Sequence, residues 1–526
     1  MLLFKSAKQS SGATISTSLN DQTRAELEAR AVTPGSGPGG AAEGFRIARG
    51  RRGAGPAVAG RRALAVTAGK AARGTIRRLG RGSGSALPGR AALAVDARLL
   101  AALAAEISRG TVLVTGTNGK GTTCRMLAAM MRASGLHPLL NREGSNQPAG
   151  LASTLLAHAT ASGHLPADAA AVGVFEVDEG SLGEVLGQVE PFAAVFTNIF
   201  RGQMDRYLEL DYLVRRLERV LLELPADATL VLNADDPRLA YLGSELTNPR
   251  VWYGLEDLGH RRSGVDHTSD FPRCPRCAGE LRYTSVFYAH LGHWECRGCG
   301  LARPEPQVRA VQADLAGPGS SRLQVVAPAT EAVLEVPLPG LFNAYNALAA
   351  AGAATACQLP SAALTAVDQV TSGCLRMEQV SVDGREVYLL LAKNCSGFTE
   401  VLRAVLGGGR PGYLMLGLND QARQQEPDVS WIWDVDFESL RGLVPSAVLS
   451  GNRASDLAVR LKYARWSGPG GQSDVAVEPD PVRAFRLAVS RTPRDQPVWV
   501  VSTDLALRQL REWLRRRGHV GRLWER

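Results

Sequence analysis

The stretch TVLVTGTNGKGTTCRM, from Thr111 to Met126, decides the fold of this chain. It opens with a short apolar run typical of a buried strand and closes with an alanine- and leucine-rich helical pattern. Between the two lies a glycine-rich turn that places Lys120 at the start of the helix. Backbone N–H groups at a helix N-terminus favour anions, and a lysine adds positive charge. The stretch therefore predicts a strand, a phosphate-binding loop and a helix.

The loop GTNGKGTT is shorter than the full P-loop pattern, because its first glycine lies too close to the lysine. A plain strand-to-helix turn with an exposed lysine is the alternative. We expect the loop backbone to hold phosphates, Lys120 to neutralise their charge, and Thr122 or Thr123 to give a hydroxyl to Mg²⁺. The predicted ATP-binding residues of the loop are Gly116, Thr117, Asn118, Gly119, Lys120, Gly121, Thr122 and Thr123.

Magnesium also needs carboxylates, and several acidic residues follow a later strand-like run. The segment AVGVFEVDEG carries Glu176 directly after the apolar run, followed by Asp178 and Glu179. Ligands of a parallel sheet bind at the carboxyl ends of its strands. Glu176 is accordingly the predicted magnesium ligand, together with Thr122. Two further strand ends are rich in polar residues and are expected at the same edge: Asn198, Gln203 and Asp205, then Asn233, Asp235 and Asp236.

Strands and helices alternate along the rest of the chain, which predicts βαβ units and mostly parallel sheets. Expected strands are 171–177, 193–198, 228–233 and 250–253, then 386–392, 412–417, 447–450 and 498–502. Expected helices are 97–107, 212–223 and 343–357. We therefore predict a disordered, low-complexity extension (1–58), a central ATP-binding α/β domain (59–370) and a Rossmann-like α/β C-terminal domain (371–526).

Two cysteine pairs, CPRC and CRGC, interrupt the central domain within an insertion at about 268–305. Their spacing, C-x2-C-x18-C-x2-C, is typical of a tetrahedral zinc site in a zinc ribbon. Four thiolates leave no open position for water, so the zinc is expected to be structural. The alternative, four unligated cysteines, is the weaker one. The predicted zinc ligands are Cys274, Cys277, Cys296 and Cys299.

The net charge of +9 is concentrated near the N-terminus, where residues 44–90 hold 12 Lys and Arg and no Asp or Glu. Such a segment could contact nucleic acid or an anionic lipid surface, or remain a solvated arm. No run of 18 apolar residues and no secretory signal is visible, so the cytoplasm is the expected location, with a peripheral position at the inner membrane face also open.

Six motifs occur in an order that resembles Mur ligases and folylpolyglutamate synthases: VTGTNGKGTT, FEVDEGS, TNIFRGQMDRY, LNADDP, GLFNAYNALAA and LRMEQV. The four-cysteine insertion, AKNCSGFTEVL and the segment LNDQARQQEPDVSWIWDVDFE narrow this resemblance to the MurT family. The resemblance covers roughly residues 59–526. It implies a Mur ligase-like fold, with ATP, Mg²⁺ and a structural Zn²⁺ as cofactors.

The resemblance also implies an activity, a substrate and a partner. MurT-type proteins are the synthetase subunits of lipid II isoglutaminyl synthase, a carbon–nitrogen ligase of peptidoglycan biosynthesis. They activate the α-carboxylate of D-glutamate in the lipid II stem peptide as an acyl phosphate. Ammonia from a GatD-type glutamine amidotransferase subunit then gives D-isoglutamine. The four cysteines outside the zinc pairs show no nucleophile setting, which agrees with a separate glutaminase in a heterodimer.

Carried over residue by residue, the resemblance assigns further site residues. Asn343 and Asn346 match the helix start near the nucleotide, and Arg376 matches an arginine that reaches ATP. Asp428 matches the aspartate that completes the partner's Cys–His pair, while Asp434 and Asp436 are close enough to be alternatives. Asp428 could also simply cap a following helix. Lys120, Glu176 and Asp428 are the predicted catalytic residues.

The sequence departs from the family patterns at several positions. Gly121 stands where Mur ligases usually have Thr, Gln203 where many have a metal-binding His, and Cys395 where a Pro is usual. The UDP-sugar domain of Mur ligases has no counterpart before the loop, which favours a lipid-linked substrate. An amino-acid-adding Mur or folate ligase and a zinc-ribbon nucleic-acid-binding ATPase are the competing hypotheses. Nucleic acid is not expected as a partner, because polar and acidic residues crowd the strand ends.

Overall fold

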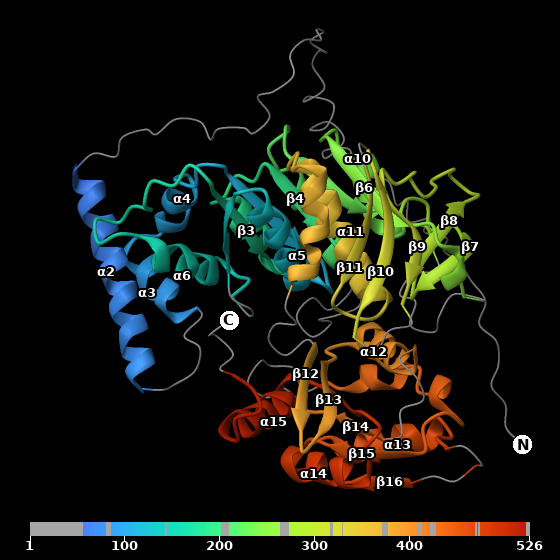
Figure 1. Ribbon diagram of the computed structural model, residues 1–526. Helices are drawn as coiled ribbons and strands as arrows, with labels where there is room; N and C mark the ends of the chain where they lie inside the picture. Colours follow the sequence, from blue (N-terminus) through green and yellow to red (C-terminus); the bar gives the residue numbers. More distant parts are fainter. Residues whose placement is uncertain are drawn as a thin grey trace, which may run out of the picture.

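The computed structural model places the chain in two α/β layers, with a separate two-stranded ribbon beside the first layer (Figure 1). Among the described residues, no helix is both long and apolar enough to cross a bilayer. The residues described are 56–79, 86–141, 145–200, 210–262, 273–315, 319–328, 330–370, 377–407, 413–420, 428–468, 471 and 474–521.

The first layer is a nine-stranded sheet with the order β11-β10-β9-β6-β5-β4-β1-β3-β2. From β2 to β9 all neighbouring strands are parallel, and β10 runs antiparallel to both of its neighbours. The strands are β1 (Thr111–Thr115), β2 (His137–Leu140), β3 (Ala171–Glu176), β4 (Ala193–Phe196), β5 (Thr229–Asn233), β6 (Arg250–Leu255), β9 (Val308–Asp314), β10 (Ser321–Ala327) and β11 (Thr330–Val336).

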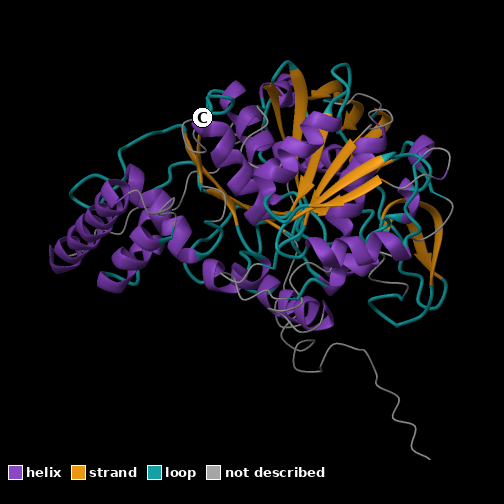
Figure 2. Cartoon of the chain, turned by 90° about the horizontal axis from the view of Figure 1, so that it is seen from below, coloured by secondary structure: helices purple, strands orange, loops and turns teal. Residues whose placement is uncertain are grey.

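Both faces of this sheet are covered by helices, as expected for parallel strands (Figure 2). In β1, Val112 and Val114 face a core shared with α5 and α11, whereas Leu113 faces a core shared with α4, α6 and α10. The helices are α2 (Pro56–Leu79), α3 (Leu87–Val95), α4 (Leu99–Ala104), α5 (Lys120–Ala133), α6 (Pro148–His158), α7 (Leu182–Leu186), α9 (Leu210–Leu221), α10 (Pro237–Glu245) and α11 (Leu341–Ala356), with 3-10 turns η1 (Glu179–Ser181), η2 (Leu258–His260) and η3 (Ser361–Gln369).

The second layer is a six-stranded sheet with the order β12-β13-β17-β14-β15-β16, in which only β12 is antiparallel. Its strands are β12 (Met377–Val382), β13 (Arg385–Leu391), β14 (Tyr413–Gly417), β15 (Ser446–Ser450), β16 (Asp474–Val477) and β17 (Val498–Ser502). Its helices are α12 (Cys395–Gly407), α13 (Ala454–Tyr463), α14 (Pro481–Arg491) and α15 (Asp504–Arg516), with 3-10 turns η4 (Ser430–Asp434) and η5 (Glu438–Leu440). In Figure 1, α12 is the element of this layer that lies next to the first sheet.

The ribbon consists of β7 (Leu281–Tyr288) and β8 (Leu291–Cys296), inserted in the chain between β6 and β9. The cysteine pairs lie at its base, because Cys274 and Cys277 precede β7, Cys296 ends β8 and Cys299 follows it, so the expected insertion into the first layer is present. The α/β fold class predicted from the sequence is confirmed, and each expected strand is found within two residues at either end.

One expected helix is much shorter than predicted. The pattern over 97–107 contains only α4, because the chain leaves the helix after Ala104 and turns through Gly110, whose φ is +75°. The antiparallel strands β10 and β11 were not predicted. The extension expected to be disordered (1–58) lies almost wholly outside the described residues.

Candidate functional site

The loop after β1 depends on two glycines with positive φ, Gly116 at +118° and Gly119 at +88°. A side chain at either position would be strained, and no space exists for one. A Cβ on Gly119 would lie 1.9 Å from Asn346 Oδ1, and one on Gly116 would lie 2.3 Å from Thr197 Oγ1. The loop therefore packs directly on the end of β4 and on α11.

Residues after β4 hold the loop in place. The Asn118 N–H donates to Asn198 Oδ1 at 2.9 Å, and the Thr117 N–H donates to the Asn198 carbonyl at 2.9 Å. The Thr117 hydroxyl donates to the Phe200 carbonyl at 3.1 Å. The polar residues that follow β4 were expected near a ligand. They also support the phosphate loop.

A cavity opens beside this loop, between the two sheets. Its wall combines the loop and α5, the end of β3, the start of α11, the ribbon, and the region of the second sheet around β13 and α12. The lining residues are Thr117, Asn118, Gly119, Lys120, Thr122, Arg125, Asn146, Glu176, Asn198, Tyr288, Leu338, Phe342, Asn343, Asn346, Met377, Leu391, Ala392, Lys393, Gly397 and Val401.

Lys120 is buried in the wall and forms an ion pair there. Its Nζ lies 3.0 Å from Glu179 Oε2 and also donates to the carbonyls of Gly116 and Thr117. Burial alone would lower the pKa of Lys120, but the carboxylates of Glu179, Glu176 and Asp178 outweigh it and raise the pKa. Burial also raises the pKa of Glu179. The lysine is therefore a permanent cation at this wall.

Glu176 and Thr122 both line the cavity, whereas Thr123 is fully buried and is not part of its wall. Asn141 fixes the Glu176 backbone from both sides: its Oδ1 accepts from the Glu176 N–H and its Nδ2 donates to the Glu176 carbonyl, both at 2.8 Å. A carboxylate and a hydroxyl are ligands suited to Mg²⁺. These two donors suit a magnesium ion.

The helix α11 contributes its first turn to the cavity. Asn343 Nδ2 donates to the Pro339 carbonyl at 2.8 Å, and Asn346 Nδ2 donates to Asn343 Oδ1 at 3.1 Å. Both asparagines lie on the wall, as predicted, and Asn346 also touches the loop at Gly119.

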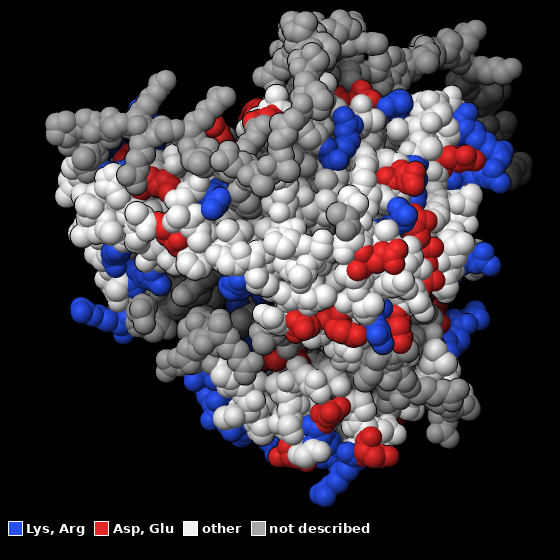
Figure 3. Space-filling view, turned by 45° about the horizontal axis from the view of Figure 1, so that its top comes forward, with Lys and Arg blue, Asp and Glu red and all other residues white. Residues whose placement is uncertain are grey.

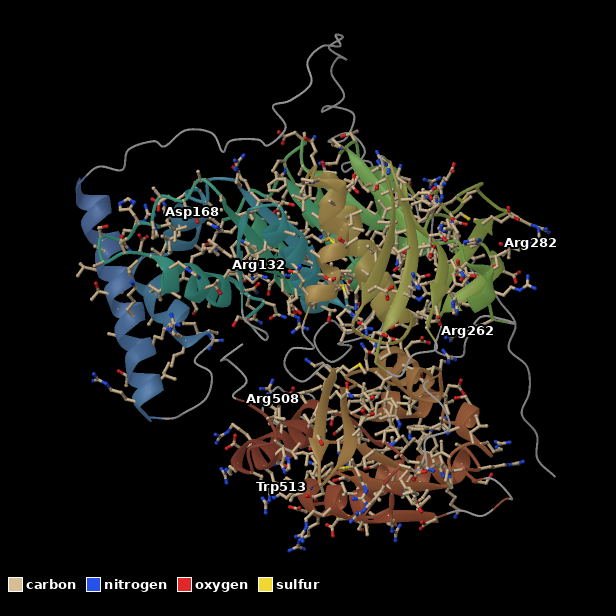
Figure 4. All side chains as sticks on the ribbon, in the orientation of Figure 1. Arg132, Asp168, Arg262, Arg282, Arg508 and Trp513 are labelled. Atoms are coloured by element: carbon tan, nitrogen blue, oxygen red, sulfur yellow. The ribbon has the colours of Figure 1, made fainter. Side chains whose placement is uncertain are left out.

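The second sheet reaches the phosphate loop through residues that the sequence did not single out. Asn394 Nδ2 donates to Asn118 Oδ1 at 3.0 Å, and Asn118 Nδ2 donates to Ser396 Oγ at 3.4 Å. A second contact between the layers is the ion pair of Arg262 and Glu400, at 3.0 Å (Figure 4). In the sequence, the motif AKNCSGF supported only the family resemblance. Nothing in its residues indicated that it would contact the phosphate loop.

Some predicted polar residues lie away from the cavity. Asp235 is fully buried and accepts from Arg303 Nε and from the Tyr345 hydroxyl, both at 2.6 Å. Asp236 caps α10 and accepts from the Ile199 N–H at 2.8 Å. The end of β5 does lie at the same edge of the parallel sheet as the ends of β3 and β4, as expected, but both of its carboxylates hold the fold and neither lines the cavity. Gly116 and Gly121 shape the loop without lining the cavity. Gln203, Asp205 and Arg376 lie outside the described residues.

The four paired cysteines converge as predicted. Their sulfur atoms all lie within 4.8 Å of one another, with 3.6 Å between Cys274 and Cys299 and 3.5 Å between Cys277 and Cys296. Tetrahedral zinc with Zn–S bonds of about 2.3 Å places its sulfurs about 3.8 Å apart. The donor set therefore fits a zinc ion held by four thiolates.

Asp428 lies on the exposed surface of the second layer, far along the chain from the loop. Its Oδ1 accepts from the Ser430 N–H at 2.8 Å and its Oδ2 accepts from the Ser430 hydroxyl at 3.0 Å. Asp428 thus binds the first residue of η4, although the N-cap of η4 is Val429 and not Asp428. The carboxylate remains exposed. Asp436 is engaged differently, because Arg403 Nη2 lies 3.1 Å from its Oδ2.

The two tryptophans after Asp428 have different environments. Trp431 is half-buried and packs against Phe398, with ring centroids 6.2 Å apart. Trp433 is 48% exposed and contacts Tyr463, which is 71% exposed, at 5.5 Å between centroids. Trp431 therefore packs against the core of this layer, whereas Trp433 lies on its surface.

Two family models match the chain, and their order agrees with the order of the two layers. Residues 114–270 match the Mur ligase middle domain, and residues 391–505 match the MurT ligase C-terminal domain. The first match covers the phosphate loop and Glu176, and the second covers Asn394, Ser396 and Asp428.

Curated relatives and solved structures agree with these matches. The chain is 31% identical over 377 residues to the lipid II isoglutaminyl synthase (glutamine-hydrolyzing) subunit MurT of Staphylococcus aureus, covering 71% of this chain and 82% of that one. It is 32% identical over 375 residues to the protein of the same name from Streptococcus pneumoniae, covering 70% and 80%.

The similarity to solved structures supports the fold. The pseudomurein peptide ligase type C from Methanothermus fervidus aligns with a TM-score of 0.59 at 21% identity, covering 78% of this chain and 79% of that one. At this identity the match speaks for the fold alone. Together with the sequence identity to its relatives, it leads to one conclusion: the chain belongs to the MurT family and has a Mur ligase fold.

Proposed function

We propose that the chain is the synthetase subunit of a lipid II isoglutaminyl synthase. The single observation that carries this proposal is the cavity between the two sheets, where a phosphate loop, Glu176 and Thr122 face a wall from the second layer. The names of the relatives indicate the class of substrate and product. Membership of the Mur ligase family indicates that the reaction uses ATP and Mg²⁺.

The reaction divides into two steps. In the first, an oxygen of the D-glutamate α-carboxylate of the stem peptide attacks the γ-phosphorus of ATP, and ADP leaves. In the second, the nitrogen of ammonia attacks the acyl carbon and phosphate leaves with the oxygen that joined it to carbon. Loss of a proton from nitrogen then gives the amide of D-isoglutamine.

The cavity residues have separate roles in this scheme. The N–H groups of the loop and the Lys120 ammonium bind the phosphates, because they place positive charge where the transferred phosphoryl group carries negative charge. Glu176 and Thr122 hold Mg²⁺, which neutralises phosphate charge when bound. Asn343 and Asn346 orient the nucleotide, and the family resemblance assigns the same role to Arg376, which lies outside the described residues. Lys393, exposed at the cavity mouth, is available to the acyl group or its phosphate.

The ammonia source is a GatD-type glutaminase bound to the second layer as a heterodimer. Asp428 would complete the partner's Cys–His pair, since an acid beside the imidazole orients it and stabilises its charged form. The exposed rings of Trp433 and Tyr463 lie on the same part of the layer and give the partner an apolar anchor. A structural Zn²⁺ bound by the four cysteines would stabilise the ribbon.

A lipid-linked substrate requires access to a membrane, and α2 offers a basic surface. The exposed basic residues of this part of the chain include Lys70 and Arg78 on α2 and Arg90 on α3, and Figure 3 shows blue Lys and Arg side chains at its left edge, with acidic ones nearby. Anionic lipid attracts such residues by about 1 kcal/mol each. Changing these three to Glu should abolish sedimentation with phosphatidylglycerol vesicles, whereas Arg282→Glu on the ribbon should not. Equal sedimentation of both variants would remove this surface from the proposal.

The experiment that tests the proposed function uses the purified chain with its glutaminase and lipid II. With ATP, Mg²⁺ and glutamine, mass spectrometry should find the stem-peptide carboxyl converted to an amide. The chain without its partner should do the same with ammonium chloride and not with glutamine. Failure with both nitrogen sources would contradict the proposal.

A further inference from the structure

The turn of the ribbon is buried, although the ribbon is an insertion in the chain. The hairpin turns at Ala289 and His290 between β7 and β8, and Tyr288, His290 and Leu291 are at most 2% exposed. Hairpin turns usually run over the surface, because their backbone groups need water. The turn therefore also packs in the interior of the protein, in addition to joining the two strands next to the cysteine site.

The turn packs against the residues that support the phosphate loop. The Phe200 ring lies 4.9 Å from the Tyr288 ring and 4.8 Å from the His290 ring, measured between centroids. Phe200 is itself joined to the loop, since its N–H donates to the Thr117 hydroxyl at 3.0 Å. The ribbon thus contacts the loop through a single intervening residue.

The Tyr288 side chain itself lines the cavity. On this wall Tyr288 lies together with Asn118 of the loop, whose Nδ2 donates to Ser396 Oγ, at the start of α12, at 3.4 Å. Burial raises the pKa of Tyr288 well above its ordinary value, so the hydroxyl keeps its proton. Three separate parts of the chain therefore meet at one point: the loop, the ribbon and the second layer.

The base of the hairpin is fixed by the cysteines. Cys296 is the last residue of β8 and pairs in register with Leu281, the first residue of β7. At about 3.4 Å per residue, β8 carries this fixed base to a turn roughly 17 Å away. Near the cysteines, Arg303 Nε is bound to Asp235 at 2.6 Å, which ties the base to the first sheet. A displaced base would move the turn.

We propose that Tyr288 is a positioning residue of the nucleotide site: its hydroxyl hydrogen-bonds at the junction of Asn118 and Ser396, so that the phosphate loop and the second layer close on the same cavity. The hairpin that carries Tyr288 is held next to its turn by the Gly292 N–H, which donates to the Asp235 carbonyl at 3.0 Å, and the four-cysteine centre supports its base. This inference rests on the proposed ATP site, and it assigns the ribbon a part in nucleotide binding.

The test compares Tyr288→Phe with Tyr388→Phe. The first variant keeps the ring against Phe200 and removes the hydroxyl. The second removes a hydroxyl that bonds Glu386 Oε2 at 3.2 Å on the second sheet, away from the cavity. Mg·ADP affinity is measured by titration calorimetry, and KM for ATP, kcat, the thermal midpoint and zinc content are measured beside it.

Tyr288→Phe should bind Mg·ADP roughly three- to tenfold more weakly, the loss expected for one hydrogen bond, and its KM for ATP should rise by a similar factor. Its zinc content and thermal midpoint should match those of Tyr388→Phe, which should bind like the wild type. Unchanged affinity and KM in Tyr288→Phe would overturn the inference alone. A wild-type chain that fails to bind Mg·ADP would overturn the proposed function together with it.

A second measurement tests the link to the cysteines. Cys277→Ser removes the exposed member of the set. Hydrogen exchange should then quicken in the ribbon turn at residues 288–291 and in the loop at residues 117–120. Arg282→Ala, on the outer side of the same ribbon (Figure 4), should leave both segments protected. Metal loss without faster exchange in the loop would overturn this part of the inference.

Discussion

Lys120 and Glu179 form an ion pair of 3.0 Å in which both side chains are buried, at 6% and 7% exposure. The lysine expected to meet phosphate is thus already paired with a carboxylate. A phosphate arriving at Lys120 competes with Glu179, and the raised pKa of Glu179 makes proton uptake by this carboxyl easier at that moment. The raised pKa of Lys120 keeps its charge at neutral pH. That contribution to stability is lost only as the pH rises beyond the lysine's ordinary value of 10.5 and through its folded pKa.

The first prediction concerns this pair. Lys120→Ala should abolish ATP-dependent amidation, but it also leaves Glu179 buried without a cation, at a cost of about 3–5 kcal/mol in stability. Lys120→Met combined with Glu179→Gln removes both charges and should regain most of that stability while remaining inactive. Glu179→Gln alone should bind Mg·ADP at least as tightly as the wild type.

Calorimetric binding and thermal unfolding check these variants together. Turnover in the stable double variant would remove Lys120 from the mechanism. Weaker nucleotide binding by Glu179→Gln would mean that Glu179 orients the lysine for phosphate and does not compete with it.

The sequence predicted the parts of the site that are local in the chain. The pattern around Thr111–Thr115 and the glycines of the loop defines one strand and one turn, and Glu176 follows a strand directly. Glu179 is the third acidic residue of the same segment. No sequence pattern indicated that η1, which contains Glu179, would bring its side chain to Lys120.

The remainder of the site comes from contacts between distant segments. Asn118 and Asn394 are 276 residues apart, and their hydrogen bond depends on how the two sheets pack. Tyr288 is brought to the cavity by the path of an inserted ribbon. No spacing or periodicity encodes either contact. The structural role of Asp235 could not be predicted for the same reason, because its partner Arg303 lies beyond the ribbon in the chain.

The second prediction contrasts two tryptophans in one turn. Trp433→Ala should leave the fold intact and weaken binding of the glutaminase by about 2 kcal/mol or more, because an exposed aromatic anchor is removed. Trp431→Ala should instead lower the stability of the chain, since its ring packs in the core. Biolayer interferometry and thermal unfolding separate the two effects. Partner binding that is insensitive to Trp433→Ala would place the interface elsewhere.

The third prediction concerns Asp428. Asp428→Asn should lower glutamine-driven amidation by the complex on the order of 100-fold, because the partner's imidazole loses its acid. Amidation from added ammonium should persist, since the ATP cavity is formed by other residues. Asp434→Asn and Asp436→Asn are the matched controls and should keep both activities. A parallel fall in both activities of Asp428→Asn, or no fall in either, would show that Asp428 serves only its local contacts with Ser430.

The fourth prediction concerns the metal. One zinc ion per chain should be found by elemental analysis, bound by the four cysteines. Cys296→Ser should lose the metal and lower the thermal midpoint, because a closed thiolate site contributes directly to folding. A Cys296→Ser protein with wild-type metal content and stability would contradict the assignment.

The central claim is that the carboxylate is activated by phosphoryl transfer from ATP at the cavity. Its most direct test is lipid II labelled with ¹⁸O in both oxygens of the D-glutamate α-carboxylate, amidated by the complex in unlabelled water. An acyl phosphate predicts that one labelled oxygen appears in inorganic phosphate for each amide formed, while the other remains in the amide. Inorganic phosphate without label, at full amide yield, would contradict the account.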